Sequence, residues 1–404
     1  MFNAHVLELV TEADAQEALK RVGVQARGRP ILTRKGLFRA VKLQDVDFRE
    51  AIIAKQEMLG AGGDAATPKG IVDFSKEKAD VILLGTLLHF KRFIAKMRSQ
   101  PLRCKAIGSE VEAVLSNYER FSFTLRFPRR DLAINKTLVM GVLNVTPDSF
   151  SDGGRYLQPE EAIMRAEQMV EEGADLVDVG AESTRPSSEP ISHEEEWRRL
   201  EPVLKVLVDR LEIPISVDTY KPETAARALD LGVSMVNDVK GLGDAEMVRL
   251  VAKHDVPAVI MHMQGDPRTM QVDPRYEEVV ADILRFLRRR IANAVGGGVD
   301  QDKLIVDPGI GFGKSLEHNL ELLRRLGEFR SLGRPLLVGT SRKSFIGKVL
   351  DSDVAGRLEG SLATAVLAVS RGAHIVRVHD VRETVRAVRV ADAILGRDST
   401  CLPT

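Results

Sequence analysis

From residue 137 onwards, short aliphatic runs alternate with amphipathic segments of helix length. Eight of these runs are predicted to be strands, at 138–143, 176–179, 215–217, 235–236, 258–261, 304–306, 336–338 and 375–378. Apolar runs this short, rich in β-branched residues, are typical of strands that are buried on both faces of a parallel sheet. Each strand is followed by a helical pattern, which indicates repeated β–α units. The count of eight favours a closed (β/α)8 TIM barrel over a doubly wound open sheet.

The residues before the barrel have the mixed patterning of a smaller α/β domain. Helices are predicted at 12–22, 48–59, 87–97 and 109–118, and strands at 5–10, 81–84 and 121–127. The stretch Pro128–Asp131 that comes next has the composition of a linker. We therefore expect an accessory domain of unassigned role at 1–130 and the barrel at 131–404. On this division, a chain that begins near Leu132 should still fold and be active. The competing views are that residues 1–130 cap the bottom of the barrel or supply part of a dimer surface, or that they regulate the barrel domain.

Composition and charge indicate what kind of protein this is and which binding partners to expect. A chain of 404 residues with 29% charged and 44% hydrophobic residues suits a globular protein of two domains. Its 58 basic and 58 acidic residues cancel, which gives no electrostatic reason to expect nucleic acid or membrane binding. The chain has no apolar run near 18 residues and no apolar leader, so we expect a cytoplasmic protein. Cys104 and Cys401 suggest neither a disulfide framework nor a metal site.

Every predicted barrel strand is followed by polar or charged residues. In (β/α)8 barrels, catalytic residues come from the carboxyl ends of the strands. Here those positions hold Asn144, Glu182–Pro186, Asp218 and Thr219, Asn237 and Asp238, His262, Asp307–Gly309, Ser341–Ser344, Arg377 and His379. The opposite ends of the strands show no such pattern. The sequence therefore predicts one site at the carboxyl-terminal face of the barrel.

The residue types at this face suit a flat nitrogen heterocycle and a phosphorylated group. Carboxylates and an amide that could hydrogen-bond the edge of a heterocycle are Asp218, Asn237 and Asp307. Cations and donors suited to phosphate or pyrophosphate, with room for a divalent metal, are Asn144, Lys343, Arg377 and His379. No Ser/His/Asp or Cys/His nucleophile arrangement stands out. The pattern favours transfer chemistry without a protein nucleophile.

The glycine-rich run Asp307–Ser315 is not a nucleotide-binding motif. It ends like a P-loop, but Pro308 stands where that motif needs its first glycine, and Lys314 stands where the dinucleotide fingerprint needs its third. Its three glycines are interpreted as allowing the backbone to approach a flat ligand closely, with Phe312 as a wall.

Six motifs, in order and with matching spacing, resemble the dihydropteroate synthase family over residues 137–395. The first is Asn144–Gly154, a segment that follows a predicted buried strand and is too polar to belong to the core, which indicates a loop. The others are Glu182–Pro186, Met261–Gly265, Asp307–Lys314, Gly339–Ser344 and Arg377–Asp380. The resemblance implies condensation of 6-hydroxymethyl-7,8-dihydropterin pyrophosphate with p-aminobenzoate, which gives 7,8-dihydropteroate and pyrophosphate in folate biosynthesis.

The resemblance also implies a role for each motif residue. The pterin would be held by Asp218, Asn237, Met261, Asp307, Phe312 and Lys343. The pyrophosphate would be held by Asn144, Thr184, Arg377 and His379, with Mg²⁺ on Asn144. The p-aminobenzoate would be held by Phe150, Asp152, Thr184, Arg185, Pro186 and Ser344. The catalytic set would be Asn144, Asp218, Asp307 and Lys343. A homodimer through a helix at 362–369, which is apolar on all sides, is also expected.

Two other functions share part of this pattern. A pterin-dependent methyltransferase would use the same barrel and the same Asp/Asn/Asp set but needs no pyrophosphate site. A non-catalytic pterin-binding protein would lose Asn144, Lys343 or the first two loops, and all of these are present. Ser187–Ser188 beside the second loop and Lys240, where a small residue is usual, depart from the family pattern. The change beside the second loop leaves sulfonamide sensitivity open.

Overall fold

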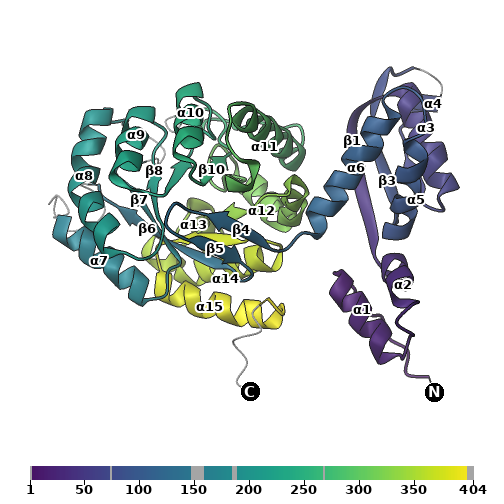
Figure 1. The fold of residues 1–404 in the computed structure, drawn as a ribbon, viewed down its shortest axis with the longest axis horizontal. Helices are drawn as coiled ribbons and strands as arrows, with labels where there is room; N and C mark the ends of the chain where they lie inside the picture. The colour runs from purple at the N-terminus through teal and green to yellow at the C-terminus, as the bar shows by residue number, and fades with distance from the viewer. Residues whose placement is uncertain (1, 73–74, 147–158, 184–188, 267–268, 398–404) are drawn as a thin grey trace. The chain divides into compact units, whose positions relative to one another are not determined.

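The computed structural model describes residues 2–72, 75–146, 159–183, 189–266 and 269–397. The chain divides into two compact units at Glu119/Arg120, rather than at the predicted boundary of 130/131. Figure 1 shows both units.

The N-terminal unit is a small α/β domain with an antiparallel sheet in the order β1-β3-β2. Its elements are α1 (Glu12–Arg21), α2 (Arg29–Gly36), β1 (Phe38–Asp47), α3 (Phe48–Gly60), β2 (Asp64–Ala66), α4 (Lys69–Val72), β3 (Lys78–Thr86), α5 (Leu87–Met97) and α6 (Cys104–Glu119). The four helices predicted in this region are confirmed. The strand predicted at 5–10 is wrong, since these residues are irregular and mostly exposed. The sequence reading missed β1, in which Val41, Leu43 and Val46 are buried between polar residues.

The second unit is the predicted (β/α)8 barrel. Its strands are β6 (Leu138–Asn144), β7 (Leu176–Gly180), β8 (Ile215–Asp218), β9 (Met235–Asp238), β10 (Ala258–Met261), β11 (Leu304–Asp307), β12 (Leu337–Val338) and β13 (Ile375–Val378). They pair in parallel in the order β11-β10-β9-β8-β7-β6-β13-β12. A parallel bridge between Val306 and Leu336 joins the two end strands and closes the barrel.

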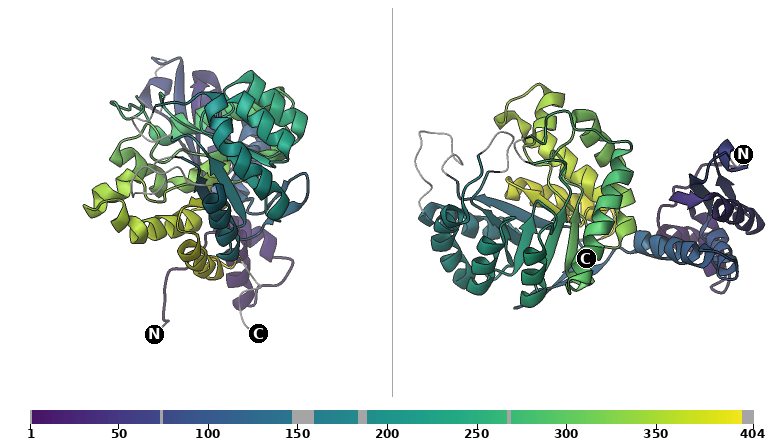
Figure 2. Two further views of the ribbon diagram at one scale, coloured as in Figure 1. Left: turned by 90° about the vertical axis from the view of Figure 1, so that its left-hand side faces the viewer. Right: turned by 90° about the horizontal axis from the view of Figure 1, so that it is seen from above.

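Nine α-helices in the described part of this unit surround the strands (Figures 1 and 2). They are α7 (Pro159–Glu171), α8 (His193–Arg210), α9 (Pro222–Leu231), α10 (Ala245–His254), α11 (Val279–Gly296), α12 (Leu316–Arg324), α13 (Ser344–Leu350), α14 (Leu358–Ser370) and α15 (Val381–Ile394), with short 3-10 turns at Gln301–Lys303, Leu326–Leu332 and Ala355–Arg357. Outward-facing strand residues such as Val177 and Val236 pack with the inner faces of these helices in one continuous core. This core holds the strand ends, and with them the candidate site, in fixed positions.

A two-stranded hairpin closes the amino-terminal end of the barrel. It consists of β4 (Phe123–Arg126) and β5 (Asp131–Ile134). Phe123, Leu125 and Ile134 of the hairpin form a buried cluster with residues at the start of seven barrel strands, among them Met140 and Ile305. The predicted linker at Pro128–Asp131 is therefore wrong, because this stretch is the turn of the hairpin. Pro and Arg suit a turn as well as a linker, so composition alone could not separate the two.

The turn itself is fixed to the barrel. The Phe127 N–H donates to the Arg130 carbonyl across the turn at 3.0 Å. The Arg129 guanidinium donates to the Val208 carbonyl of α8 at 2.9 Å. The alternative prediction, that residues before 131 cap the bottom of the barrel, is therefore confirmed for the part of them that forms the β4–β5 hairpin. Within the described residues, no helix is long and apolar enough to cross a membrane.

Candidate active site

The strand register gathers the predicted ring-binding residues at one end of the barrel. Asp218 pairs with Asn237 across β8 and β9, and Met261 pairs with Asp307 across β10 and β11. All four residues are the last or next-to-last of their strands, and Asn237, Met261 and Asp307 are buried. Parallel strands place such ends at one edge, so the structure brings together residues that are far apart in the sequence.

Arg377 connects three strands of this face through two ion pairs. Its Nε donates to Oδ2 of Asp178 at 2.6 Å, and its Nη2 donates to Oδ2 of Asp218 at 2.7 Å. The side-chain amide of Asn237 donates to the same Oδ2 of Asp178 at 2.9 Å. The guanidinium therefore fixes Asp178 and Asp218 relative to one another, and Asp178 fixes the orientation of the Asn237 amide.

Asp178 is the functional residue that the sequence reading missed. It lies in the middle of β7 and is fully buried, and it was hidden in an aliphatic run that was assigned only as a strand. A carboxylate in a strand that is buried on both faces needs a partner, and that requirement could have singled it out. Among the described residues, its Oδ1 has no hydrogen-bond partner.

Burial perturbs the acidity of three groups here. Burial raises the pKa of Asp218 to about 7, and the nearby Asp178 adds to this effect while Arg377 opposes it. Burial also raises the pKa of Asp307, against the opposing influence of Lys343 and of the Gly309 N–H. Burial lowers the pKa of Lys343 to about 8, although Asp307 opposes that change. Buried acids and a lysine whose pKa values are perturbed and which influence one another are typical of a functional site.

Lys343 lies against the glycine-rich loop after β11. Its Nζ donates to the Ile310 carbonyl and lies 4.6 Å from the centroid of the Phe312 ring. Oδ1 of Asp307 accepts from the Gly309 N–H at 2.7 Å. These contacts place Phe312 and Lys343 beside Asp307, as the predicted pterin site requires.

The glycines of this loop are explained by a neighbouring loop rather than by a ligand. A Cβ at Gly309 would lie 1.9 Å from the His262 carbonyl, and one at Gly313 would lie 2.5 Å from the Gln264 carbonyl. Both glycines also have positive φ, at 69° and 61°. The interpretation that the glycines admit a flat ligand was therefore wrong for these two positions: the segment after β10 occupies that space.

A buried lysine joins the same two loops. Nζ of Lys314 donates to the Phe312 carbonyl at 2.8 Å and lies 3.0 Å from Nδ1 of His262. Burial lowers the pKa of both side chains. His262, a candidate from its strand-end position, thus makes a contact that holds Phe312 in place.

The remaining predicted anion-binding residues come from β6 and from the segments after β12 and β13. Asn144 ends β6 and is half-buried. Nδ1 of His379 lies 3.0 Å from Oγ of Ser341. Ser344 is the first residue of α13, where backbone N–H groups have no partner within the helix. The predicted site residues Phe150, Asp152, Thr184, Arg185 and Pro186 lie outside the described residues.

The described residues of this site could hold a Mg²⁺ ion with few protein ligands, but they do not form the cluster of ligands that a structural metal needs. No group of three or more His, Cys, Asp or Glu residues with metal-site geometry occurs in the part of the chain that the structure describes. Mg²⁺ is commonly held by one or two protein oxygens together with substrate phosphates and water. Asn144 offers one such amide oxygen at the end of β6, and β6 pairs with β13, the strand that carries Arg377.

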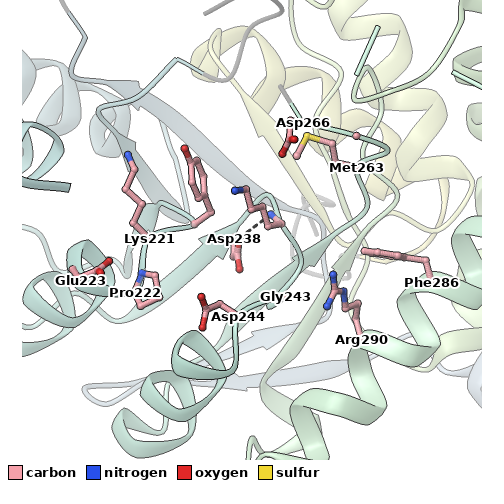
Figure 3. A pocket seen from close by; sticks show the side chains of 13 residues that line it. Lys221, Pro222, Glu223, Asp238, Gly243, Asp244, Met263, Asp266, Phe286 and Arg290 are labelled. Carbon is pink, nitrogen blue, oxygen red and sulfur yellow. Dashed lines mark hydrogen bonds between the residues drawn. The ribbon is translucent and has the colours of Figure 1, made fainter. Parts of the chain in front are cut away.

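A cavity of about 540 Å³ opens beside this site, beyond the ends of β8, β9 and β10 (Figure 3). Its lining includes Tyr220, Asp238, Lys240, Met263 and Arg290. Lys240, a departure from the family pattern, lies over the Tyr220 ring with its Nζ 4.0 Å from the ring centroid. Asp218, Asn237, Asp307 and Lys343 do not line this cavity.

The barrel is similar in sequence and in fold to known proteins. Residues 140–379 match the family described as pterin binding enzyme. Dihydropteroate synthase of Escherichia coli K12 is 48% identical over 258 residues, which cover 64% of this chain and 92% of the relative. The solved Yersinia pestis dihydropteroate synthase with a sulfonamide drug complex is 42% identical, with a TM-score of 0.66, and covers 68% of this chain and 100% of its own. The Xanthomonas albilineans enzyme in complex with 7,8-dihydropteroate is 41% identical, with a TM-score of 0.62, over 69% and 100% of the two chains.

A different relative extends into the N-terminal unit. A probable bifunctional folylpolyglutamate synthase/dihydropteroate synthase of Halobacterium salinarum is 42% identical over 380 residues. The match covers 94% of this chain and 46% of the relative, so the chain spans about half the length of that protein.

Proposed function

This chain belongs to the pterin-binding enzymes and, within them, to the dihydropteroate synthases, and from that premise we propose how the residues of its barrel perform the reaction. The chain condenses 6-hydroxymethyl-7,8-dihydropterin pyrophosphate with p-aminobenzoate to 7,8-dihydropteroate and pyrophosphate, a step of folate biosynthesis. The methyltransferase and non-catalytic alternatives have no support in these relatives.

The pterin ring is bound by the network formed by Asp178 in the middle of β7 and by residues at the ends of β8, β9 and β11. One N–H of the Asn237 amide donates to Asp178, which leaves its other N–H and its oxygen for the ring. Oδ1 of Asp178 has no partner among the described residues, and Asp218 and Asp307 offer further acceptors for ring N–H groups. Lys343 supplies a donor, and Phe312 and Met261 supply apolar surface. A ring without these N–H groups would leave buried carboxylates unpaired, which is the basis of selectivity.

The pyrophosphate is bound on the side of β6 and β13. Arg377 uses two of its five N–H groups in its pairs with Asp178 and Asp218, which leaves others for an anion. His379 and Asn144 complete the site, and Asn144 would hold Mg²⁺. When bound, the metal neutralises charge on the leaving pyrophosphate. Thr184, also assigned to this anion, lies outside the described residues.

The transfer needs no nucleophile from the protein. The C–O bond between the pterin methylene and the pyrophosphate breaks, and its electron pair leaves with the pyrophosphate. Buried carboxylates, above all Asp307, stabilise the electron-poor pterin methylene. The arylamine nitrogen then forms the new C–N bond and loses a proton. Because water would capture the same carbon, the buried position of Asp307 and Asn237 also protects the electron-poor methylene until the amine attacks.

For p-aminobenzoate, the described residue that we assign is Ser344 at the start of α13. Ser344, as the first residue of that helix, offers a hydroxyl and a backbone N–H to the substrate carboxylate. Phe150, Asp152, Arg185 and Pro186 are assigned to this substrate by the family pattern alone.

The observation that carries these assignments is the Arg377-centred network between Asp178, Asp218 and Asn237, next to Asp307 and Lys343. The test is a coupled assay for pyrophosphate release that depends on p-aminobenzoate. Wild-type chain should release pyrophosphate and form dihydropteroate, and Asp307→Ala should be folded but inactive. Near-normal turnover by a folded Asp307→Ala variant would remove Asp307 from the pterin site.

We also propose a homodimer through α14 and α15. The two helices pack together, and Leu367, Val390 and Ile394 expose 52%, 62% and 80% of their surface. The predicted helix at 362–369 thus buries one face in the barrel and leaves apolar residues on another. A second copy would cover them by two-fold symmetry.

The small soluble substrates, together with the charge and cysteine pattern, favour a cytoplasmic location.

A further inference from the structure

Two buried polar atoms on neighbouring barrel strands have no hydrogen-bond partner among the described residues. They are Oδ1 of Asp178 in β7 and Oγ of Ser216 in β8. Both residues are 0% exposed. Buried polar groups of folded proteins are nearly always paired, either with the protein or with ordered water, because an unpaired one destabilises the fold. Both atoms therefore need a partner from outside the described chain.

The two side chains point into the barrel rather than towards its helices. Side chains alternate between the two faces of a strand, so the neighbours of a residue show which face it occupies. The residues on either side of Asp178 and of Ser216 all belong to the core between the strands and the helices; they are Val177, Val179, Ile215 and Val217. Asp178 and Ser216 therefore share the opposite face, inside the barrel.

The strand register makes Asp178 and Ser216 direct neighbours. They pair across β7 and β8, and paired strands lie about 4.8 Å apart. Leu176, two residues before Asp178, belongs to the apolar cluster that fills the amino-terminal part of the barrel interior. Asp218, two residues after Ser216, lies on the same face and nearer the carboxyl ends of the strands. The two unpaired atoms thus lie at the level between the apolar cluster and the residues proposed to bind the pterin.

A single water molecule suits the chemistry of this pair. The hydroxyl of Ser216 can donate one hydrogen bond and accept two, and Oδ1 of Asp178 can only accept. The two groups are adjacent but do not bond to each other directly, which is the arrangement that a bridging water satisfies. The other oxygen of Asp178, Oδ2, already accepts from Arg377 at 2.6 Å and from Asn237 at 2.9 Å. A water on Oδ1 would hold the carboxylate from its remaining side.

We infer that Oγ of Ser216 and Oδ1 of Asp178 bind one buried water molecule beneath the pterin site, and that Ser216 is thereby a positioning residue for Asp178. The inference rests on the proposed function, in which Asp178 belongs to the network that binds the pterin. A carboxylate oxygen accepts more than one hydrogen bond, so the water leaves Oδ1 available to a ring N–H. Ser216 acts on the substrate only through Asp178 and the two groups that Asp178 orients.

The test compares two substitutions of nearly equal volume in the full chain. Ser216→Thr keeps a hydroxyl and Ser216→Val has a methyl group in its place, so the difference between the two variants isolates the hydroxyl. Ser99→Ala is the control, because the exposed Ser99 hydroxyl donates to the Lys96 carbonyl in the N-terminal unit. Crystal structures locate the water, calorimetry gives the Kd of the pterin pyrophosphate, pyrophosphate release gives KM for p-aminobenzoate, and thermal unfolding verifies the fold.

We expect the wild-type crystal structure to show one water about 2.7–3.2 Å from both Ser216 Oγ and Asp178 Oδ1, and Ser216→Val to lose it. Ser216→Val should bind the pterin pyrophosphate roughly tenfold or more weakly than Ser216→Thr, since a hydrogen bond to a charged group is lost. KM for p-aminobenzoate at saturating pterin pyrophosphate should change by less than about threefold, and Ser99→Ala should match wild type.

A wild-type crystal structure with no water between the two residues, or with a direct hydrogen bond between them, overturns the inference even if Ser216→Val does not fold. Equal affinities of folded Ser216→Thr and Ser216→Val for the pterin pyrophosphate also overturn it, because the hydroxyl would then have no effect on the site. A wild-type chain that does not condense the two substrates would instead refute the proposed function, and the crystal structure would still decide whether the water is bound.

Discussion

Asp178 accepts hydrogen bonds from both Arg377 and Asn237, so its substitution should lower kcat/KM. Asp178→Asn keeps the size of the side chain but removes the negative charge that pairs with Arg377 and replaces one of the two acceptor oxygens of Asp178 by an NH2 group. Hydrogen bonds to charged groups contribute about 1.5–3 kcal/mol, so kcat/KM should fall roughly ten- to a hundredfold. Steady-state kinetics with both substrates measures this, and Asp209→Asn on the exposed face of α8 serves as control. Wild-type kcat/KM for Asp178→Asn would show that the network is not part of the site.

Asp218 should make the stability of the fold depend on pH. Burial raises its pKa to about 7 in the folded chain, from 3.8 as the ordinary value. The folded state therefore holds this proton more tightly than the unfolded state, and its contribution to stability is full below about pH 4 and is lost as pH rises through about 7. Denaturant unfolding across this range should show a decline in wild type that is smaller in Asp218→Asn. Parallel pH profiles for the two proteins would contradict the assignment.

Residues at strand ends could be predicted and residues inside strands could not. Asp218, Asn237, Asp307 and Lys343 come after aliphatic runs, and the barrel topology then requires them to converge. Asp178 gives no such signal, because the face of β7 that it occupies depends on the strand register.

Among the elements, the β4–β5 hairpin decides where the catalytic unit begins. A chain that starts at Leu132 loses β4 and uncovers Met140, Leu176 and Ile305 at the barrel bottom. It should aggregate or unfold early, whereas a chain that starts at Arg120 should unfold like the barrel of the full protein. In the full chain, Leu125→Ala should cost about 2–5 kcal/mol, because Leu125 is fully buried. Thermal unfolding and light scattering of these proteins measure both effects; a stable, soluble chain from Leu132 would show that the hairpin is dispensable.

Long periodic elements were predictable and edge elements were not. The eight barrel strands and the helices α3 and α5 could be read directly from apolar periodicity. The strand β1 lies at the edge of its sheet and buries only alternate residues among Arg39, Lys42 and Asp47, so its signal is weak. The hairpin turn carries the residues of a linker, and only its contacts with the barrel distinguish the two.

At the scale of the whole molecule, the proposed dimer through α14 and α15 can be tested by a substitution that introduces one charged side chain. Leu367→Glu places a carboxylate in the proposed apolar interface, where it would lose its hydration without gaining a partner. Light scattering at micromolar concentration should give a dimer for wild type and a monomer for the variant, with unfolding of each chain otherwise similar. A wild-type monomer at that concentration would reject the dimer.

The two units match different sets of relatives, so the catalytic assignment concerns the barrel unit alone. The Escherichia coli relative matches 64% of the chain, whereas the haloarchaeal bifunctional relative matches 94%. Every described residue assigned to a substrate lies after Arg120, within the barrel unit.

The most direct test of the proposed reaction is pyrophosphate release by the isolated barrel unit, residues 120–404, with the pterin pyrophosphate and with or without p-aminobenzoate. We predict release that requires p-aminobenzoate, yields 7,8-dihydropteroate, and disappears in Asp307→Ala of the same unit. A folded barrel unit that binds the pterin pyrophosphate but cannot transfer it, while the full chain can, would contradict the claim that the barrel contains the complete site.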